Sequence, residues 1–332
     1  MQVPGRSALV LASCVLGCHG GTQQARHAAP DRGTRGDEKP EAVSLLGEAL
    51  YRPPLAAEKR RELEADLAQA RREFELHPDD PERVIWLGRR LAYLGRYRES
   101  LEVYGRGIER WPDHAKLRRH RGHRYITVRD LDAAVADLER AAALIEGVPD
   151  EIEPDGAPNK SGIPVSTSHT NIWYHLGLAY YLQGKLDEAR RCYAECLRLC
   201  TNDDMLCATS HWLYMTLRRL GRHEEAERLL APIHGDMRIL EDFAYHRLLL
   251  MYKGETAPES LLDPSTGDVD LASVGYGVGS WYSYNGRIDD ARATFERIVR
   301  DAPWSAFGRI AAEADLARLR ASSPRPGAGH RD

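Results

Sequence analysis

A short phrase of polar and small residues recurs four times along the chain. Each copy has a Gly, a basic residue, two further residues, an acid and a small residue, and a bulky residue follows four positions later. Gly adopts the left-handed backbone that ends a helix, and acids are favoured in the first turn of the next helix. Residues four apart share a helix face, so the phrase predicts packed pairs of helices. The copies begin at Gly95, Gly184, Gly221 and Gly286.

A second pattern lies upstream of these turns and returns with a constant period. Residues 173–180 spell W-x2-L-G-x2-Y, and parts of this phrase occur in other hairpins. Gly88 and Gly122 are 34 residues apart, and Gly177 lies 102 residues, three such periods, before Gly279. A fixed period of this length indicates helix pairs that stack along one axis.

The signature and its period resemble the tetratricopeptide repeat (TPR), over roughly residues 81–304. The resemblance implies an all-α fold, a right-handed superhelical solenoid of helix-turn-helix repeats with polar-faced capping helices. The expected organisation is N-terminal capping helices over 41–80, two repeats over 81–146, an insertion loop over 147–169, two repeats over 170–240, a degenerate repeat over 241–271, a last repeat over 272–305, a C-terminal capping helix over 306–321 and a disordered tail over 322–332.

Residues 1–18 have the character of a bacterial lipoprotein signal peptide. An uncharged apolar run over 7–17 is too short to span a bilayer, and it ends at Cys18 in the sequence VLGC. This sequence resembles the lipobox, which implies that Cys18 is lipidated, with Cys14 as the alternative. An ordinary cleaved signal, or an uncleaved tail with two chance cysteines, stays open.

Residues 19–40 contain almost no apolar side chain larger than Ala, so we expect a flexible tether. The signal and the tether together predict a body that is lipid-anchored in the bacterial cell envelope and faces the periplasm. The residue after Cys18 is His19 and not the Asp linked to inner-membrane retention in some bacteria, which favours the outer membrane.

Charge and motifs narrow the range of functions. The chain has 46 Lys and Arg against 50 Asp and Glu, a net charge of −4 that excludes a general polyanion binder, so we expect no nucleic-acid partner. The sequence contains no P-loop, no G-x-S-x-G and no HExxH, and we assign no catalytic residue, cofactor or metal. The resemblance implies a non-catalytic adaptor or scaffold that binds a protein or peptide. The oligomeric state stays open.

The resemblance also implies a binding surface, the concave face formed mainly by the first helix of each pair. Tyr supplies flat contact area and Arg grips carboxylates, whereas a merely solvated face is the alternative. Some TPR proteins hold the C-terminal carboxylate of a peptide with Lys and Asn side chains. At the corresponding positions this chain has Asn171 but no Lys. The expected groove residues are Arg89, Tyr93, Arg119, His123, Asn171, Tyr174, Tyr181, His211, Arg218 and Tyr276.

The insertion 147–169 contains four prolines and is longer than most structureless loops. A lid or self-peptide lying across the groove and a passive spacer are equally open interpretations. Arg121 occupies a position that faces inward in the family, and a buried guanidinium needs a paired acid. We therefore hypothesise that Arg121 holds this loop through one of its acids.

Histidines and cysteines give two further hypotheses. The His and Arg cluster of repeats two to four suggests, as the alternative function, a metal-dependent or other enzyme-like module, although the spacing matches no metal motif. Cys200 and Cys207 flank a turn, and in an oxidising envelope they could form a disulfide that joins two hairpins. A scaffold that assembles through its convex face or its ends is a third possibility.

Overall fold

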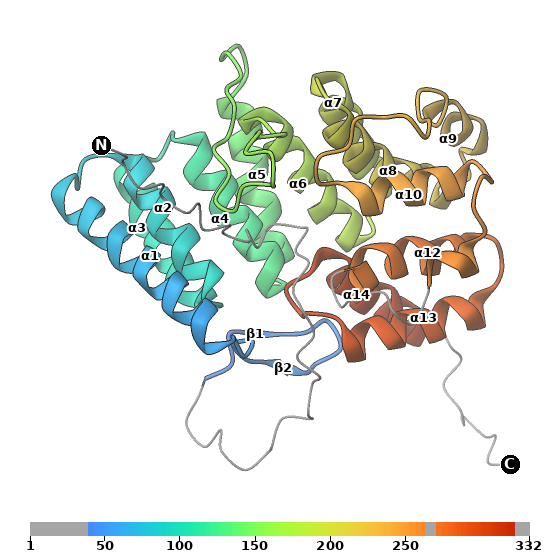
Figure 1. The fold of residues 1–332 in the computed structure, drawn as a ribbon, viewed down its shortest axis with the longest axis horizontal. Coiled ribbons are helices and arrows are strands. Elements are labelled where there is room, and N and C mark those ends of the chain that lie inside the picture. Colours follow the sequence, from blue (N-terminus) through green and yellow to red (C-terminus); the bar gives the residue numbers. More distant parts are fainter. Residues whose placement is uncertain (1–38, 263–269, 323–332) are drawn as a thin grey trace, which may run out of the picture.

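Helices make up most of the described chain, and they follow one another in pairs joined by tight turns (Figure 1). The computed structural model describes residues 39–262 and 270–322, so the expected signal, the lipidation cysteine, most of the tether and the tail lie outside the described residues. The all-α solenoid of helical hairpins predicted from the repeat is confirmed. The pairs are α2 (Pro81–Tyr93) with α3 (Tyr97–Arg110), α4 (Ala115–Val128) with α5 (Leu131–Leu144), α6 (Ser168–Gln183) with α7 (Leu186–Leu199), α8 (Asp203–Arg219) with α9 (His223–Leu229), and α12 (Tyr276–Tyr284) with α13 (Ile288–Asp301).

The turns within the pairs use the backbone conformation that the recurring phrase predicts. Gly95, Gly184, Gly221 and Gly286 all have φ between +71° and +81°. The turn between α4 and α5 has Arg129 at φ +69°, a conformation that disfavours a residue with a Cβ atom. Arg129 is therefore held there by contacts elsewhere in the molecule.

Each pair closes through a glycine of the first helix and a bulky residue of the second. A Cβ atom on Gly177 would lie 2.8 Å from the ring of Tyr193, closer than packed atoms allow. The glycines of the repeat therefore let the two helices approach, and the bulky residues fill the space. The same contact is made by Gly88 with Tyr104, by Gly122 with Leu138 and by Gly279 with Phe295.

The N-terminal segment 41–80 differs from the capping helices expected there. Strands β1 (Ala42–Val43) and β2 (Ala49–Leu50) form an antiparallel hairpin, and only α1 (Ala57–Leu76) is helical. Strands of two residues are too short for an alternating pattern to reveal them. α1 packs against α2 through Leu63 and Leu67, as a cap of the array does.

In its described residues, the degenerate repeat begins with a regular helix and continues irregularly. α10 (Phe243–Tyr252) is followed by a short 3₁₀ helix over Pro258–Leu261. A π-helical turn over Leu271–Gly275 then runs directly into α12.

The last helix, α14 (Phe307–Ser322), differs from the polar-faced end cap expected over 306–321. It packs against α12, α13 and α6, and every residue from Ile310 to Leu316 is at most 6% exposed. Small alanines on several sides let neighbouring helices approach it from more than one direction. α14 therefore occupies the inside of the curved array.

Contacts with α14 and the residues just before it join the two ends of the array (Figure 1). Arg129 binds Glu313 of α14 at 2.7 Å, and both side chains are at most 2% exposed. The backbone N–H of Leu45, between β1 and β2, donates to Glu313 at 3.2 Å. The Trp304 indole donates to the carbonyl of Tyr51 at 2.7 Å. The described chain thus curls until its C-terminal helices meet its N-terminal hairpin.

Candidate functional site

A cavity of about 140 Å³ lies on the inner side of the array, lined mainly by α2, α4 and α6, with residues of α3, α8 and α10, and covered by the loop 147–169. The first helices of successive pairs face inward, so side chains from separate repeats meet at this cavity. The aromatic rings of Tyr104, Tyr174 and Tyr245 are part of its lining. Six of the ten predicted groove residues line it, namely Arg89, Tyr93, Arg119, His123, Asn171 and Tyr174.

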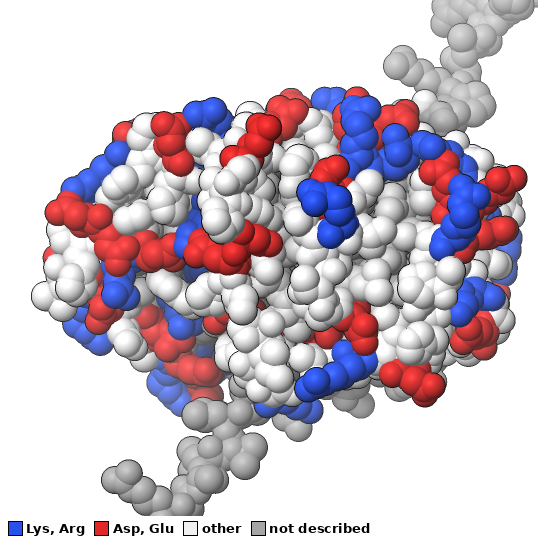
Figure 2. All heavy atoms as spheres, turned by 90° about the horizontal axis from the view of Figure 1, so that it is seen from above, with Lys and Arg blue, Asp and Glu red and all other residues white. Residues whose placement is uncertain are grey.

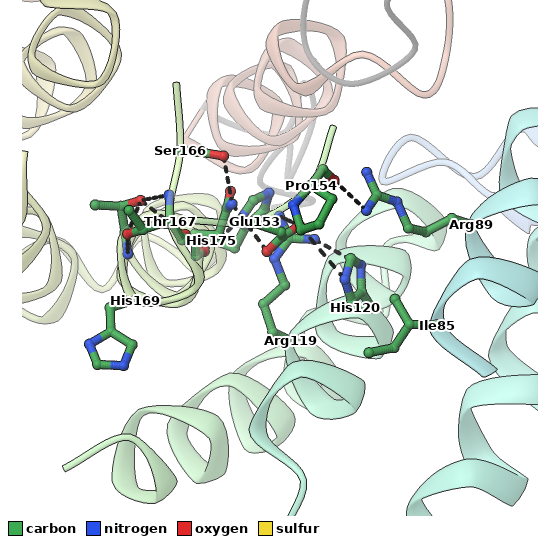
Figure 3. Close-up of polar contacts among 12 residues, drawn as sticks. Ile85, Arg89, Arg119, His120, Glu153, Pro154, Ser166, Thr167, His169 and His175 are labelled. Carbon is green, nitrogen blue, oxygen red and sulfur yellow. Dashed lines mark hydrogen bonds and ion pairs between the residues drawn. The ribbon is translucent and has the colours of Figure 1, made fainter. Parts of the chain in front are cut away.

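The loop 147–169 lies across this cavity and is bound to its wall (Figure 3). Its Glu153 carboxylate pairs with the Arg119 guanidinium at 3.1 Å and accepts from the Asn171 amide at 3.2 Å. Arg89 donates to the carbonyl oxygen of Pro154 at 2.8 Å. The groove side chains therefore hold an extended acidic segment of the chain itself, an arrangement that the lid or self-peptide interpretation expects.

The loop also has an ordered shape of its own. Ile152 and Thr167 form an antiparallel bridge at its base, and Asp150 accepts the Thr167 hydroxyl at 2.6 Å. At its tip the Asn159 side chain donates to the carbonyl of Ile163 at 2.7 Å and to Glu241 at 3.0 Å. These contacts fix where the acidic segment meets the cavity.

The hypothesis that Arg121 holds the loop is wrong. Its guanidinium forms a bidentate pair with Asp137 of α5, at 2.6 and 2.8 Å, inside its own hairpin. Arg118 also reaches Asp137, at 3.2 Å. The positions of Arg118 and Arg121 face α5, whereas Arg119 faces the cavity, so Arg119 is the residue that meets the loop acid.

Three histidines beside these arginines are neutral near pH 7. Burial, reinforced by the positive charge of Arg119, lowers the pKa of both His120 and His175 well below 6.5. Burial and the charge of Arg124 do the same to the pKa of His123. The Nδ1–H of His175 donates to the carbonyl of Asn171 at 2.6 Å, which leaves the other ring nitrogen as an acceptor.

The other four predicted groove residues, Tyr181, His211, Arg218 and Tyr276, do not line the cavity. The Tyr276 hydroxyl bonds to Tyr181 and to Asp315 of α14, both at 2.9 Å, so α14 covers this part of the inner face. His211 stacks on Tyr245 at 4.7 Å between ring centres. Arg218 lies over the ring of Tyr284 at 4.7 Å.

Position-by-position reasoning missed several cavity residues: Tyr104, His120, Arg124, Glu153, Asp155, His175 and Tyr245. His120 and His175 occupy the sixth position of consecutive helical repeats. This shared position could have predicted that both residues lie on the same face of the array. The loop acids gave no comparable signal, because their distance from the groove depends on how the loop folds back.

The disulfide considered for Cys200 and Cys207 is absent, since all four described cysteines are free. Cys200 lies against the carbonyl of Cys196 at 3.3 Å, whereas Cys207 contacts Met237 at 3.9 Å. In residues 39–262 and 270–322, no group of three His, Cys, Asp or Glu side chains is arranged to hold a metal ion. The metal-dependent alternative therefore has no ligand set in this part of the chain.

The surface around the loop carries both signs of charge. On the face shown in Figure 2, acidic and basic side chains are interspersed and do not form one large basic area. No helix among the described residues is long and apolar enough to cross a membrane.

Comparison with known families agrees with the repeat pattern. Two segments, residues 87–149 and 170–203, match models of the tetratricopeptide repeat. These segments are recognised as TPR repeats. No curated protein matches the chain significantly.

Several solved structures are similar to this chain. The MamA RS-1 ArsTM double mutant is 17% identical, with 60% of this chain and 90% of that one covered and a TM-score of 0.40. YrrB, described as a TPR protein with an unusual peptide-binding site, is 15% identical, with coverages of 76% and 98% and a TM-score of 0.40. A TPR protein from Parabacteroides merdae is 14% identical, with coverages of 79% and 87% and a TM-score of 0.42.

Proposed function

We propose that this TPR-containing chain is a non-catalytic adaptor or scaffold that binds an extended acidic segment of a protein partner on its inner face. The supporting observation is the loop 147–169, whose residues Glu153 and Pro154 are held by Arg89, Arg119 and Asn171. A side-chain set that binds a carboxylate and a main-chain carbonyl of its own chain offers the same contacts to another chain.

The loop then acts as an intramolecular competitor for this surface. A tethered segment has an effective concentration in the millimolar range, so a partner segment must displace it or bind more tightly. Glu153 is at most 6% exposed in its pair with Arg119, so removing its charge loosens the loop and leaves the guanidinium open to a partner carboxylate.

The test uses a fluorescein-labelled peptide with the sequence of residues 149–158 and the purified full chain carrying Glu153→Gln. We expect the variant to bind this peptide, measured by fluorescence anisotropy, about tenfold more tightly than the wild type does, because its own loop competes less. Adding Arg119→Gln to Glu153→Gln should abolish this increase in peptide affinity. Glu146→Gln, an exposed change at the base of the same loop, is the matched control and should behave as the wild type.

Failure of the folded Glu153→Gln chain to bind the peptide, with an unchanged circular dichroism spectrum, would refute binding of acidic segments at this surface. Binding that survives Arg119→Gln would place the peptide somewhere else on the protein.

We also propose that the adaptor is held in the cell envelope by a lipid on Cys18, facing the periplasm and with the outer membrane favoured. The support is the apolar run, the lipobox-like VLGC sequence and the polar segment 19–40. Metabolic labelling with a palmitate analogue should mark the wild type and not a Cys18→Ser variant. Label that persists in Cys18→Ser and disappears in Cys14→Ser would move the anchor to the alternative cysteine.

A further inference from the structure

The cavity under the loop 147–169 contains polar atoms that the protein leaves without partners. Nε of Arg119 and Nε2 of His175 are buried and have no hydrogen-bond partner among the described residues, and their side chains belong to residues that are 6% and 3% exposed. The carboxylate oxygen Oδ2 of Asp155 is also a buried atom without a hydrogen-bond partner. Buried polar groups are normally paired, so unpaired atoms on three residues that line one cavity point to a bound molecule.

The unpaired atoms have a definite chemistry. Arg119 Nε is a donor, and His175 Nε2 is an acceptor because the proton of this ring lies on Nδ1. Arg124 adds further donors at the cavity wall. Its guanidinium lies over the Tyr97 ring at 5.8 Å, and no carboxylate in the two described ranges forms an ion pair with it.

Size and shape limit what fits. A space of about 140 Å³ is close to the volume of a cavity that holds benzene, a molecule of about six non-hydrogen atoms. Tyr93, Arg124 and Asp155 are only half-buried, so the cavity reaches the surface beside the loop. A small molecule can therefore enter while the loop stays in place.

We propose that this cavity binds a small organic acid that carries a hydroxyl or amino donor next to its carboxylate, that is, an α-hydroxy or α-amino acid. The carboxylate accepts from Arg119 Nε and from the Arg124 guanidinium. The hydroxyl or amino group donates to His175 Nε2 or to Asp155. This site exists in the loop-bound state, because Asp155 belongs to the loop and Arg119 Nε stays unpaired beside the ion pair of Arg119 with Glu153.

Four probes of matched size separate these requirements. L-lactate and L-alanine have the carboxylate and a donor, propionate has the carboxylate alone, and L-alaninamide lacks the carboxylate. Binding to the purified full chain is measured for each by isothermal titration calorimetry and by ligand-observed NMR. We expect L-lactate or L-alanine to bind about tenfold more tightly than propionate, and L-alaninamide to bind least. The tighter of the first two identifies the donor as hydroxyl or amino.

Two variants assign the contacts. Arg124→Gln should weaken every carboxylate probe by about tenfold, and it breaks no ion pair of the described chain. His175→Phe keeps a ring against Phe307 and Tyr174 but removes the acceptor, so it should erase the preference over propionate. Arg140→Gln, whose partner is the exposed Asp113, is the control and should leave all four affinities unchanged.

The proposal is overturned if none of the four probes binds the folded wild-type chain, or if propionate binds as tightly as L-lactate and L-alanine. It is also overturned if Arg124→Gln and Arg140→Gln have equal effects. If His175→Phe does not fold, the probe series and Arg124→Gln still decide. Failure of the labelled-peptide test leaves these outcomes untouched, so the two proposals fail separately.

Discussion

Replacing Glu313 by Gln tests whether the contact between the α4–α5 turn and the last helix stabilises the fold. The Glu313 carboxylate accepts from Arg129 at 2.7 and 3.1 Å, and the exposed fractions of the two side chains are 0% and 2%. Glu313→Gln keeps the size of the side chain but leaves the guanidinium charge buried without its counter-charge. Breaking a buried pair in this way costs about 3–5 kcal/mol. The bonds from Arg129 to the carbonyls of Thr127 and Trp304 remain, so we expect a loss of about 3 kcal/mol.

Urea unfolding followed by tryptophan fluorescence measures this loss. With a slope of about 3 kcal/mol per molar urea, the midpoint should fall by about 1 M. The control Glu195→Gln removes an exposed pair with Arg198 and should cost less than about 1 kcal/mol. Adding Arg129→Gly to Glu313→Gln removes the unpaired charge and relieves the positive φ, so it should restore part of the stability. A Glu313→Gln midpoint within about 0.2 M of the wild type would refute the reasoning.

Three further predictions concern packing, the loop and pH. Gly177→Ala forces a Cβ atom against the second helix of its pair and should cost about 1–3 kcal/mol in thermal unfolding, whereas Gly235→Ala, with open space around it, should be neutral. Arg119→Leu should speed proteolysis within 147–169, and Arg121→Leu should not; the reverse order would contradict the assigned contacts. Burial holds the folded-state pKa of the three cavity histidines below 6.5, so the unfolded chain binds more protons below that pH. Their stabilising contribution is present above about pH 6.5 and should fall by about 1 kcal/mol per histidine between pH 7 and 5.5; equal urea midpoints at both pH values would contradict this.

The helical pairs were predictable because each depends on residues close in sequence. A turn glycine such as Gly184 and a contact such as that of Gly177 with Tyr193 lie within one repeat, where spacing determines geometry. The turn at Arg129 shows where this reasoning ends. A non-glycine residue is held at positive φ by Glu313, which is 184 residues away.

The candidate site was predictable only in part, for a related reason. Family positions identified Arg89 and Arg119, because the inward face of each first helix follows from the repeat. Whether that face is open depends on the sum of the small rotations between successive repeats. The sequence pattern of one repeat determines only how it packs on its neighbours, so it does not give this sum. No local pattern shows that α14 covers Tyr181 and Tyr276, or that Glu153 reaches Arg119.

The meeting of the first strands with the last helix also constrains how this architecture can change. Open arrays gain or lose whole units, since a new unit needs only to match the one before it. Here, duplicating a hairpin anywhere between Arg129 and Glu313 would move these two residues apart. Both charged side chains would then be buried without this ion pair. The number of units is therefore constrained by these long-range contacts, and variation in this chain should concentrate in its loops and exposed faces rather than in its length.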